Sequence, residues 1–131
     1  MRIETENWWR QSLKDLETAK KNLKIKEYYA AAFFAHQAVE KALKALFIEK
    51  KRKSPGPTHS LIFLGKSVGI PVKFFSILRK LNPDYVLTRY PDAAYGLPYE
   101  LYDEEMAREK IQMAEAVIEW VRKELKRLEK K

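Results

Sequence analysis

Three polar side chains capable of acid–base chemistry recur every four residues in one alanine-rich stretch, EYYAAAFFAHQAVEKALKALFIE, residues 27–49. They are His36, Glu40 and Lys44, and Lys41 lies on the neighbouring ridge. Positions four apart share one face of an α-helix, so this spacing predicts a compact polar strip. A carboxylate beside an imidazole can orient it for proton transfer, and a nearby ammonium group can bind phosphate. The strip is therefore either a functional site or a solvated helix face. His36 alone could also be a half-buried packing residue held by Glu40.

Arg89 is the strongest candidate ligand for a phosphate or carboxylate group. It ends a predicted helical turn and precedes a tyrosine-rich segment, YPDAAYGLPYELY, residues 90–102. A guanidinium group can bind phosphate through two hydrogen bonds and can stack on aromatic rings. Tyr90 and Tyr95 could stack on bases or pack as a lid over the fold. Asp92 and Asp84 offer the alternative that Arg89 is used in an ion pair with one of them.

The composition excludes several other chemistries. The chain has no cysteine, which excludes disulfides, thiolate zinc sites and cysteine nucleophiles. His36 and Glu40 could supply two metal ligands, but no H-E-x-x-H motif or second cluster supplies a third, so we expect no metal site. Glycine-rich phosphate loops and a G-x-S-x-G elbow are absent, and we expect no cofactor. His59 lies beside a predicted helix cap, where it is expected to anchor a loop.

The net charge of +8 is concentrated in the middle third of the chain. Residues 41–80 contain ten basic residues and one acidic residue. A basic surface of this kind favours binding to phosphate groups or to an acidic partner protein. A lysine-rich surface that serves solubility would give the same composition. Both interpretations remain open at the level of sequence.

We expect a cytoplasmic protein that does not interact with membranes. No apolar run approaches the ~20 residues that a transmembrane helix requires. The N-terminal sequence MRIETENWWRQ also lacks the apolar core of a signal peptide.

Helical periodicity and the scarcity of glycine and proline predict an all-α fold. The length of 131 residues suits one domain, residues 1–131. The expected helices cover residues 4–23, 27–49 and 61–68, a fourth helix from Pro71 to Leu81, a turn at 83–89 and a long helix from Asp103, with loops at 50–60 and 90–102. Together they predict an up-and-down four-helix bundle with short additional helices.

Capping residues fix several of these boundaries. Thr58 or Ser60 can cap the helix that follows, Asn82 precedes a proline in a cap-and-first-turn pattern, and Asp103 can cap the last helix.

Two adjacent tryptophans, Trp8 and Trp9, lie on the first predicted helix. Neighbouring residues on a helix point about 100° apart, so only one of them can face the core. The other could stack on a base, fill a subunit interface, or cap the core with its ring edge.

The sequence resembles the HEPN domain family over essentially its whole length. The resemblance is carried by the opening pattern from Trp8 to Ala19, by AAFFAHQAVEKALKALF at 31–47, by THSL at 58–61, and by RYPD at 89–92. It implies a helical bundle that forms a homodimer and binds nucleotides. It also implies a partner, because such domains are often encoded beside a minimal nucleotidyltransferase as a toxin and antitoxin pair. A tyrosine such as Tyr95 could then receive a nucleotidyl group from that partner.

Nuclease members of the family resemble one another in an arginine followed, after four to six residues, by a histidine. Here the arginine is Arg89, and the corresponding positions hold Ala94, Tyr95 and Gly96. The resemblance therefore predicts a nucleotide- or RNA-binding module, paired with a nucleotidyltransferase, without strong nuclease activity. One alternative is a metal-independent ribonuclease toxin that uses Arg89 with His36 or Tyr95. Another is a purely structural dimeric adaptor.

Overall fold

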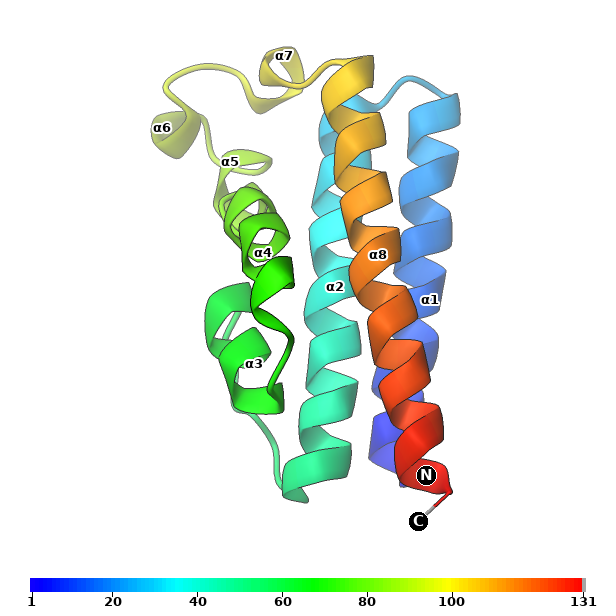
Figure 1. Ribbon diagram of the computed structural model, residues 1–131. Coiled ribbons are helices and arrows are strands. Elements are labelled where there is room, and N and C mark those ends of the chain that lie inside the picture. The colour runs from blue at the N-terminus through cyan, green and yellow to red at the C-terminus, as the bar shows by residue number, and fades with distance from the viewer. Residues whose placement is uncertain (131) are drawn as a thin grey trace.

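Three long helices form the body of the molecule in the computed structural model, which describes residues 1–130. They are α1 (Ile3–Lys24), α2 (Tyr28–Lys51) and α8 (Glu104–Glu129). Helix α1 runs antiparallel to α2 and α8, and the two ends of the chain lie at the same end of the bundle (Figure 1). No helix within residues 1–130 is long and apolar enough to cross a membrane.

The fourth side of the bundle is a series of short helices that returns along α2 (Figure 1). The series consists of α3 (Leu61–Val68), a 3₁₀ turn η1 (Val72–Phe74), α4 (Phe75–Leu81) and α5 (Asp84–Leu87). Two further short helices, α6 (Pro91–Ala94) and α7 (Pro98–Leu101), then lead into α8. The predicted all-α, up-and-down four-helix fold with short additional helices is thus confirmed.

Glycine and proline explain why the fourth side is broken into pieces. Gly69 ends α3 in the left-handed conformation with φ 73°. Pro71 lies outside the helix that was expected to begin there, and α4 starts only at Phe75. In the segment 90–102, expected to be a loop, Pro91 and Pro98 each open one helical turn.

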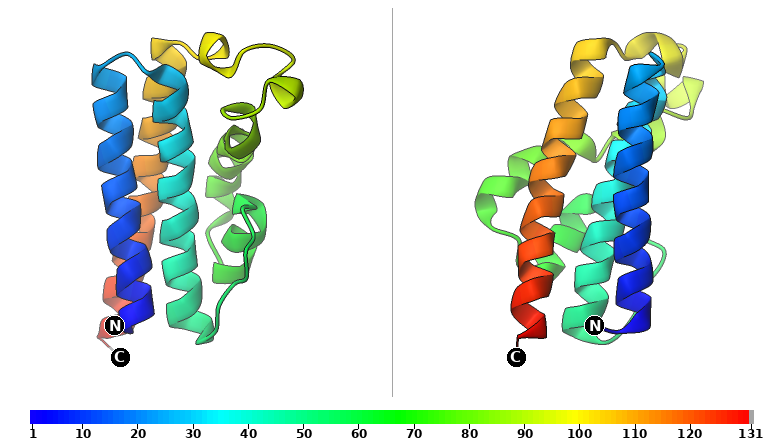
Figure 2. Two further views of the ribbon diagram at one scale, coloured as in Figure 1. Left: turned by 180° about the vertical axis from the view of Figure 1, so that it is seen from behind. Right: turned by 90° about the vertical axis from the view of Figure 1, so that its right-hand side faces the viewer.

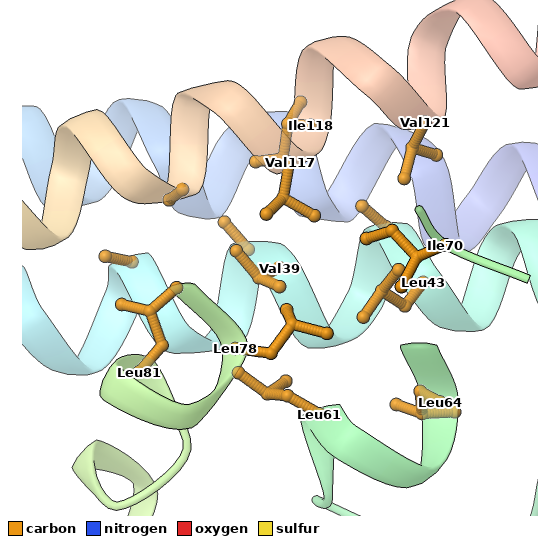
Figure 3. Close-up of a cluster of buried hydrophobic side chains, with 14 of the residues drawn as sticks. Val39, Leu43, Leu61, Leu64, Ile70, Leu78, Leu81, Val117, Ile118 and Val121 are labelled. Carbon is orange, nitrogen blue, oxygen red and sulfur yellow. The ribbon is translucent and has the colours of Figure 1, made fainter. Parts of the chain in front are cut away.

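Helix α2 is the centre of the core. Its alanines at 31, 35 and 42 are fully buried, and such small side chains let neighbouring helices approach closely. Figure 3 shows Val39 and Leu43 of α2 between the short helices on one side and α8 on the other. The apolar partners labelled there are Leu61, Leu64, Ile70, Leu78, Leu81, Val117, Ile118 and Val121.

Two of the predicted caps are confirmed and one acts elsewhere. Ser60 Oγ accepts a hydrogen bond from the Phe63 amide at 3.1 Å, and Asp103 Oδ1 accepts one from the Met106 amide at 2.8 Å. Asn82 was expected to cap the turn after it. Its Oδ1 instead accepts from the Leu61 amide at 2.9 Å, which satisfies a free N–H at the start of α3.

Candidate functional site

The polar strip on α2 is buried and is not a solvated face. His36, Glu40 and Lys44 are only 0%, 3% and 4% exposed. Lys44 Nζ lies 3.1 Å from Glu40 Oε2, so the two charges form an ion pair inside the protein. A buried charge is costly unless it is paired, and this pairing makes the strip tolerable in the core.

A histidine from another segment covers Glu40 and separates it from solvent. His59, just before the Ser60 cap of α3, places Nδ1 3.0 Å from the second oxygen of Glu40, Oε1. A carboxylate can only accept, so Nδ1 carries the hydrogen and Nε2 is left for another partner. The His59 side chain is 44% exposed. Glu40 therefore orients an imidazole that a ligand can reach.

An aromatic ring connects His59 to Arg89. Tyr85 on α5 stacks on His59 with a ring separation of 3.9 Å and an angle of 15°. Arg89 lies one helical turn after Tyr85, and its Cζ is 4.5 Å from the centre of the same ring. Arg89 also lies 5.8 Å from the Phe33 ring of α2. We call Glu40, His59, Tyr85 and Arg89 the Arg89 cluster.

The positive charge of Arg89 is not neutralised by an acid. Hydrogen bonds with the hydroxyl groups of Tyr85 and then Tyr90 raise its pKa above the ordinary value, because they stabilise the charged form. Within residues 1–130 Arg89 has no ion pair, and Asp84 is paired with Lys110 instead at 2.9 Å. The guanidinium therefore remains available for an anion.

His36 lies behind the cluster and has an unusual environment. Neither ring nitrogen has a hydrogen-bond partner within the described chain, and the Glu40 carboxylate is 4.0 Å from Nδ1. Burial lowers its pKa to about 3, with a smaller effect from the charge of His59. The ring is 5.7 Å from Tyr85. His36 is thus a neutral, enclosed neighbour of the cluster, without access to a ligand.

A second buried network holds α5 in place. Tyr102 donates a 2.7 Å hydrogen bond to Asp84 Oδ1, and Lys110 of α8 lies 2.9 Å from Oδ2. Burial raises the pKa of Asp84, and Lys110 opposes this effect. Because Asp84 precedes Tyr85, the network fixes the helix turn that presents Tyr85 and Arg89 to His59.

The remaining predicted site residues lie outside the cluster. Lys41 forms an ion pair with Asp15 of α1. Tyr95 is 97% exposed, and no hydrogen bond within residues 1–130 joins it or Asp92 to the cluster. Tyr90 is 43% exposed and accepts a hydrogen bond from Arg89. The structure therefore links Arg89 and Tyr90 to His36 and Glu40 through Tyr85 and His59, while Lys44 binds the second oxygen of Glu40.

Sequence reasoning missed Tyr85 and assigned His59 only an anchoring role. Tyr85 had a detectable signal, because its spacing of four from Arg89 puts both on one helical face. The contact between His59 and Glu40 had none, since it depends on the path of the connection between α2 and α3.

The cluster has the chemistry of an anion site. It joins a guanidinium, an oriented imidazole and aromatic faces, which suit a phosphate with an attached planar base. Among residues 1–130, no group of three or more histidine, cysteine, aspartate or glutamate side chains is placed to hold a metal ion.

Comparison with known proteins places this chain in a family. The model of the HEPN domain matches residues 5–125. A protein of Methanocaldococcus jannaschii named "Putative toxin MJ1304" is 32% identical, over 86% of this chain and 82% of its own length.

Two solved structures are also similar. The protein TT1696 from Thermus thermophilus superposes with a TM-score of 0.84 at 28% identity, covering 93% of this chain and 98% of its own. ST0689, described as an archaeal HEPN homologue, gives a TM-score of 0.80 at 32% identity, covering 94% and 98%. With the family model spanning nearly its whole length, this chain belongs to the HEPN domain family.

Proposed function

We propose that this HEPN domain binds the phosphate of a nucleotide or of single-stranded RNA at the Arg89 cluster. The observation that supports the proposal is the convergence of Arg89 and His59 on one Tyr85 ring, from segments 30 residues apart. The unneutralised guanidinium would bind phosphate oxygens, and His59 Nε2 would meet the ligand from the exposed side. The exposed Tyr90 ring would supply a stacking surface for a base, and the Tyr85 ring would hold His59 and Arg89 in position.

We further propose that the domain acts as a homodimer with a nucleotidyltransferase partner in a toxin–antitoxin-like pair. The toxin name of the Methanocaldococcus relative supports the toxin part of this proposal. Tyr95 is 97% exposed at the end of α6, so a partner enzyme could reach its hydroxyl group and transfer a nucleotidyl group to it. Co-expression with the product of an adjacent nucleotidyltransferase gene, followed by mass spectrometry, would detect a stable pair and the modified tyrosine.

The binding proposal is tested by titrating a fluorescent single-stranded RNA with wild type and Arg89→Met. Arg108→Met is the matched control, since Arg108 is exposed on α8 and forms an ion pair with Glu104. We expect Arg89→Met to lower affinity at least tenfold at low salt and to reduce the salt dependence by about one phosphate contact. Equal affinity of the two variants would refute the proposal.

A ribonuclease is the second candidate, and the contact between Glu40 and His59 favours it. With Nδ1–H directed at Glu40, His59 Nε2 could take the proton from a ribose 2′-OH. The 2′-oxygen would attack the adjacent phosphorus and the bond to the 5′-oxygen would break. A solvent water would protonate the leaving 5′-oxygen, which gives a 2′,3′-cyclic phosphate and a 5′-hydroxyl end. Arg89 would stabilise the charge on the phosphoryl oxygens. His59 would thus take the place of the missing motif histidine.

Binding and cleavage are separable by one substitution. His59→Gln should retain much of the RNA affinity, because Arg89 is unchanged, and should lose cleavage by at least a hundredfold. Wild type that leaves RNA intact at concentrations well above the binding constant would eliminate the ribonuclease candidate and leave the binding proposal standing.

A further inference from the structure

A basic pocket lies where the first turns of α1 meet the C-terminal end of α2. Its volume is about 240 Å³, and its lining includes Trp8, three cations (Arg2, Arg52 and Lys53) and one carboxylate, that of Glu4. The charge of the lining is therefore positive. The Arg89 cluster shares none of these residues.

The cationic side chains in this pocket form no ion pairs within the described residues. Within residues 1–130, none of the side chains of Arg2, Arg52 and Lys53 takes part in an ion pair. Arg52 also has a left-handed backbone with φ 58°, which is unfavourable for a residue other than glycine, asparagine or aspartate. Arginine thus occupies a position where glycine would fit the backbone better.

Trp8 is held in place by the buried side chain of Lys44. Lys44 Nζ lies 5.1 Å from the centre of its ring, and Lys44 itself is buried. The indole is half-buried and lines the pocket with its remaining surface. A ring fixed in this way can stack on a base without losing much conformational freedom.

A series of contacts joins this pocket to the Arg89 cluster. Lys44 binds one oxygen of Glu40 at 3.1 Å, and His59 binds the other at 3.0 Å. Trp8 and His59 are therefore separated by only two side chains. Figure 2, left, shows α1, which carries Trp8, and the connection that carries His59 on either side of α2 on one face of the molecule.

We propose that the Trp8 pocket is a second subsite for the same single strand of RNA. In this arrangement one nucleotide lies at the Arg89 cluster, and a nucleotide a few positions along the strand stacks on Trp8. Arg52 and Lys53 bind the phosphates beside that base. The inference rests on the proposed RNA binding, and it adds a minimum length of RNA for full affinity.

The test compares a dinucleotide, UpU, with a 12-residue oligouridine by titration. Arg52→Gly/Lys53→Ala removes two cations, and the glycine suits the left-handed backbone. Lys24→Ala/Lys26→Gly is the matched control, because both lysines are exposed at the other end of the bundle and Lys26 has φ 65°. Trp8→Leu removes the aromatic face but keeps apolar bulk.

We expect Trp8→Leu to weaken binding of the 12-mer roughly five- to 150-fold, the equivalent of ~1–3 kcal/mol per stacked base. Arg52→Gly/Lys53→Ala should weaken it at least tenfold more than the control does. Neither should change the affinity for UpU. A full-affinity Trp8→Leu variant, or equal losses in the two charge variants, would overturn the second subsite alone.

The proposed function is tested separately, by the affinity of Arg89→Met for UpU and for the 12-mer. If that variant loses UpU affinity while the pocket variants bind the 12-mer normally, only the subsite fails. If Arg89→Met binds both oligonucleotides normally, the second subsite and the proposed binding of RNA at the Arg89 cluster are both refuted. Wild type that binds neither at low salt would have the same meaning.

Discussion

His59 Nδ1 lies 3.0 Å from Glu40 Oε1, although the two residues belong to different segments of the chain. The other oxygen of this buried carboxylate binds Lys44. The Glu40 side chain therefore connects the buried Lys44 to the exposed imidazole of His59. That imidazole in turn stacks on the Tyr85 ring, on which Arg89 also packs. The polar strip supports the candidate site from within the protein, and the exposed groups of the site, His59 and Arg89, come from outside α2.

Removing one member of the ion pair between Glu40 and Lys44 should destabilise the protein far more than removing both. Glu40→Leu leaves a buried ammonium group without a carboxylate, so we expect the free energy of unfolding to fall by about 3–5 kcal/mol. Glu40→Leu/Lys44→Met removes both charges and should recover most of that loss. Urea denaturation followed by circular dichroism measures both. A double variant as unstable as the single one would contradict this account of the strip.

Stability should depend on pH through His36. Its pKa is about 3 in the folded protein against an ordinary 6.5, so below pH 6.5 the unfolded chain takes up a proton that the folded chain does not. The His36 contribution is fully present above pH 6.5 and is lost as the pH falls towards 3, by up to ~1.4 kcal/mol per pH unit. Urea denaturation at pH 4.5, 5.5, 6.5 and 7.5 should show a shallower loss in His36→Leu than in wild type. Parallel profiles would show that His36 is not the group responsible.

The hydrogen bond from Tyr102 to Asp84 should stabilise the turn that presents Arg89. Tyr102→Phe leaves a buried carboxylate oxygen without this donor, with an expected cost of about 1–3 kcal/mol. Tyr99→Phe is the matched control, because Tyr99 is 61% exposed and its loss should change stability by less than about 0.5 kcal/mol. Amide hydrogen exchange in α5 should accelerate only in Tyr102→Phe. Unchanged exchange there would exclude the anchoring role.

Tyr85 should matter for binding more than for folding. Tyr85→Leu keeps an apolar side chain but removes the ring shared by His59 and Arg89. We expect affinity for short RNA to fall about as far as in Arg89→Met, at least tenfold, while Tyr99→Leu binds as wild type does. Titration of the three variants with one labelled oligonucleotide measures the difference. Full affinity in Tyr85→Leu would mean that the ring does not position the site.

Regular periodicity made most of the architecture predictable. The alanine ridge of α2, the Ser60 cap and the Asp103 cap follow from local rules of spacing and hydrogen bonding, and all three are present. The boundaries between the short helices were less predictable, because single turns opened by Pro91 and Pro98 depend on contacts with the rest of the bundle. The role of Asn82 was missed for the same reason, since its partner Leu61 is 21 residues earlier.

The candidate site was predictable only in part. The spacing of His36, Glu40 and Lys44 correctly gave one strip, but its burial depends on what covers α2. His59 and Arg89 both pack on Tyr85 because the connection after α2 and the turn of α5 meet beside this strip, and neither path has a local sequence signal.

We propose that Arg89 and His59 form one phosphate-binding site. Nuclear magnetic resonance of labelled wild type during a titration with UpU tests it most directly, through the Arg89 Nε–Hε signal and the His59 ring signals. We predict that both shift along one saturation curve, while the Arg108 Nε–Hε signal on α8 stays in place. Binding that saturates without moving the Arg89 and His59 signals would contradict the claim.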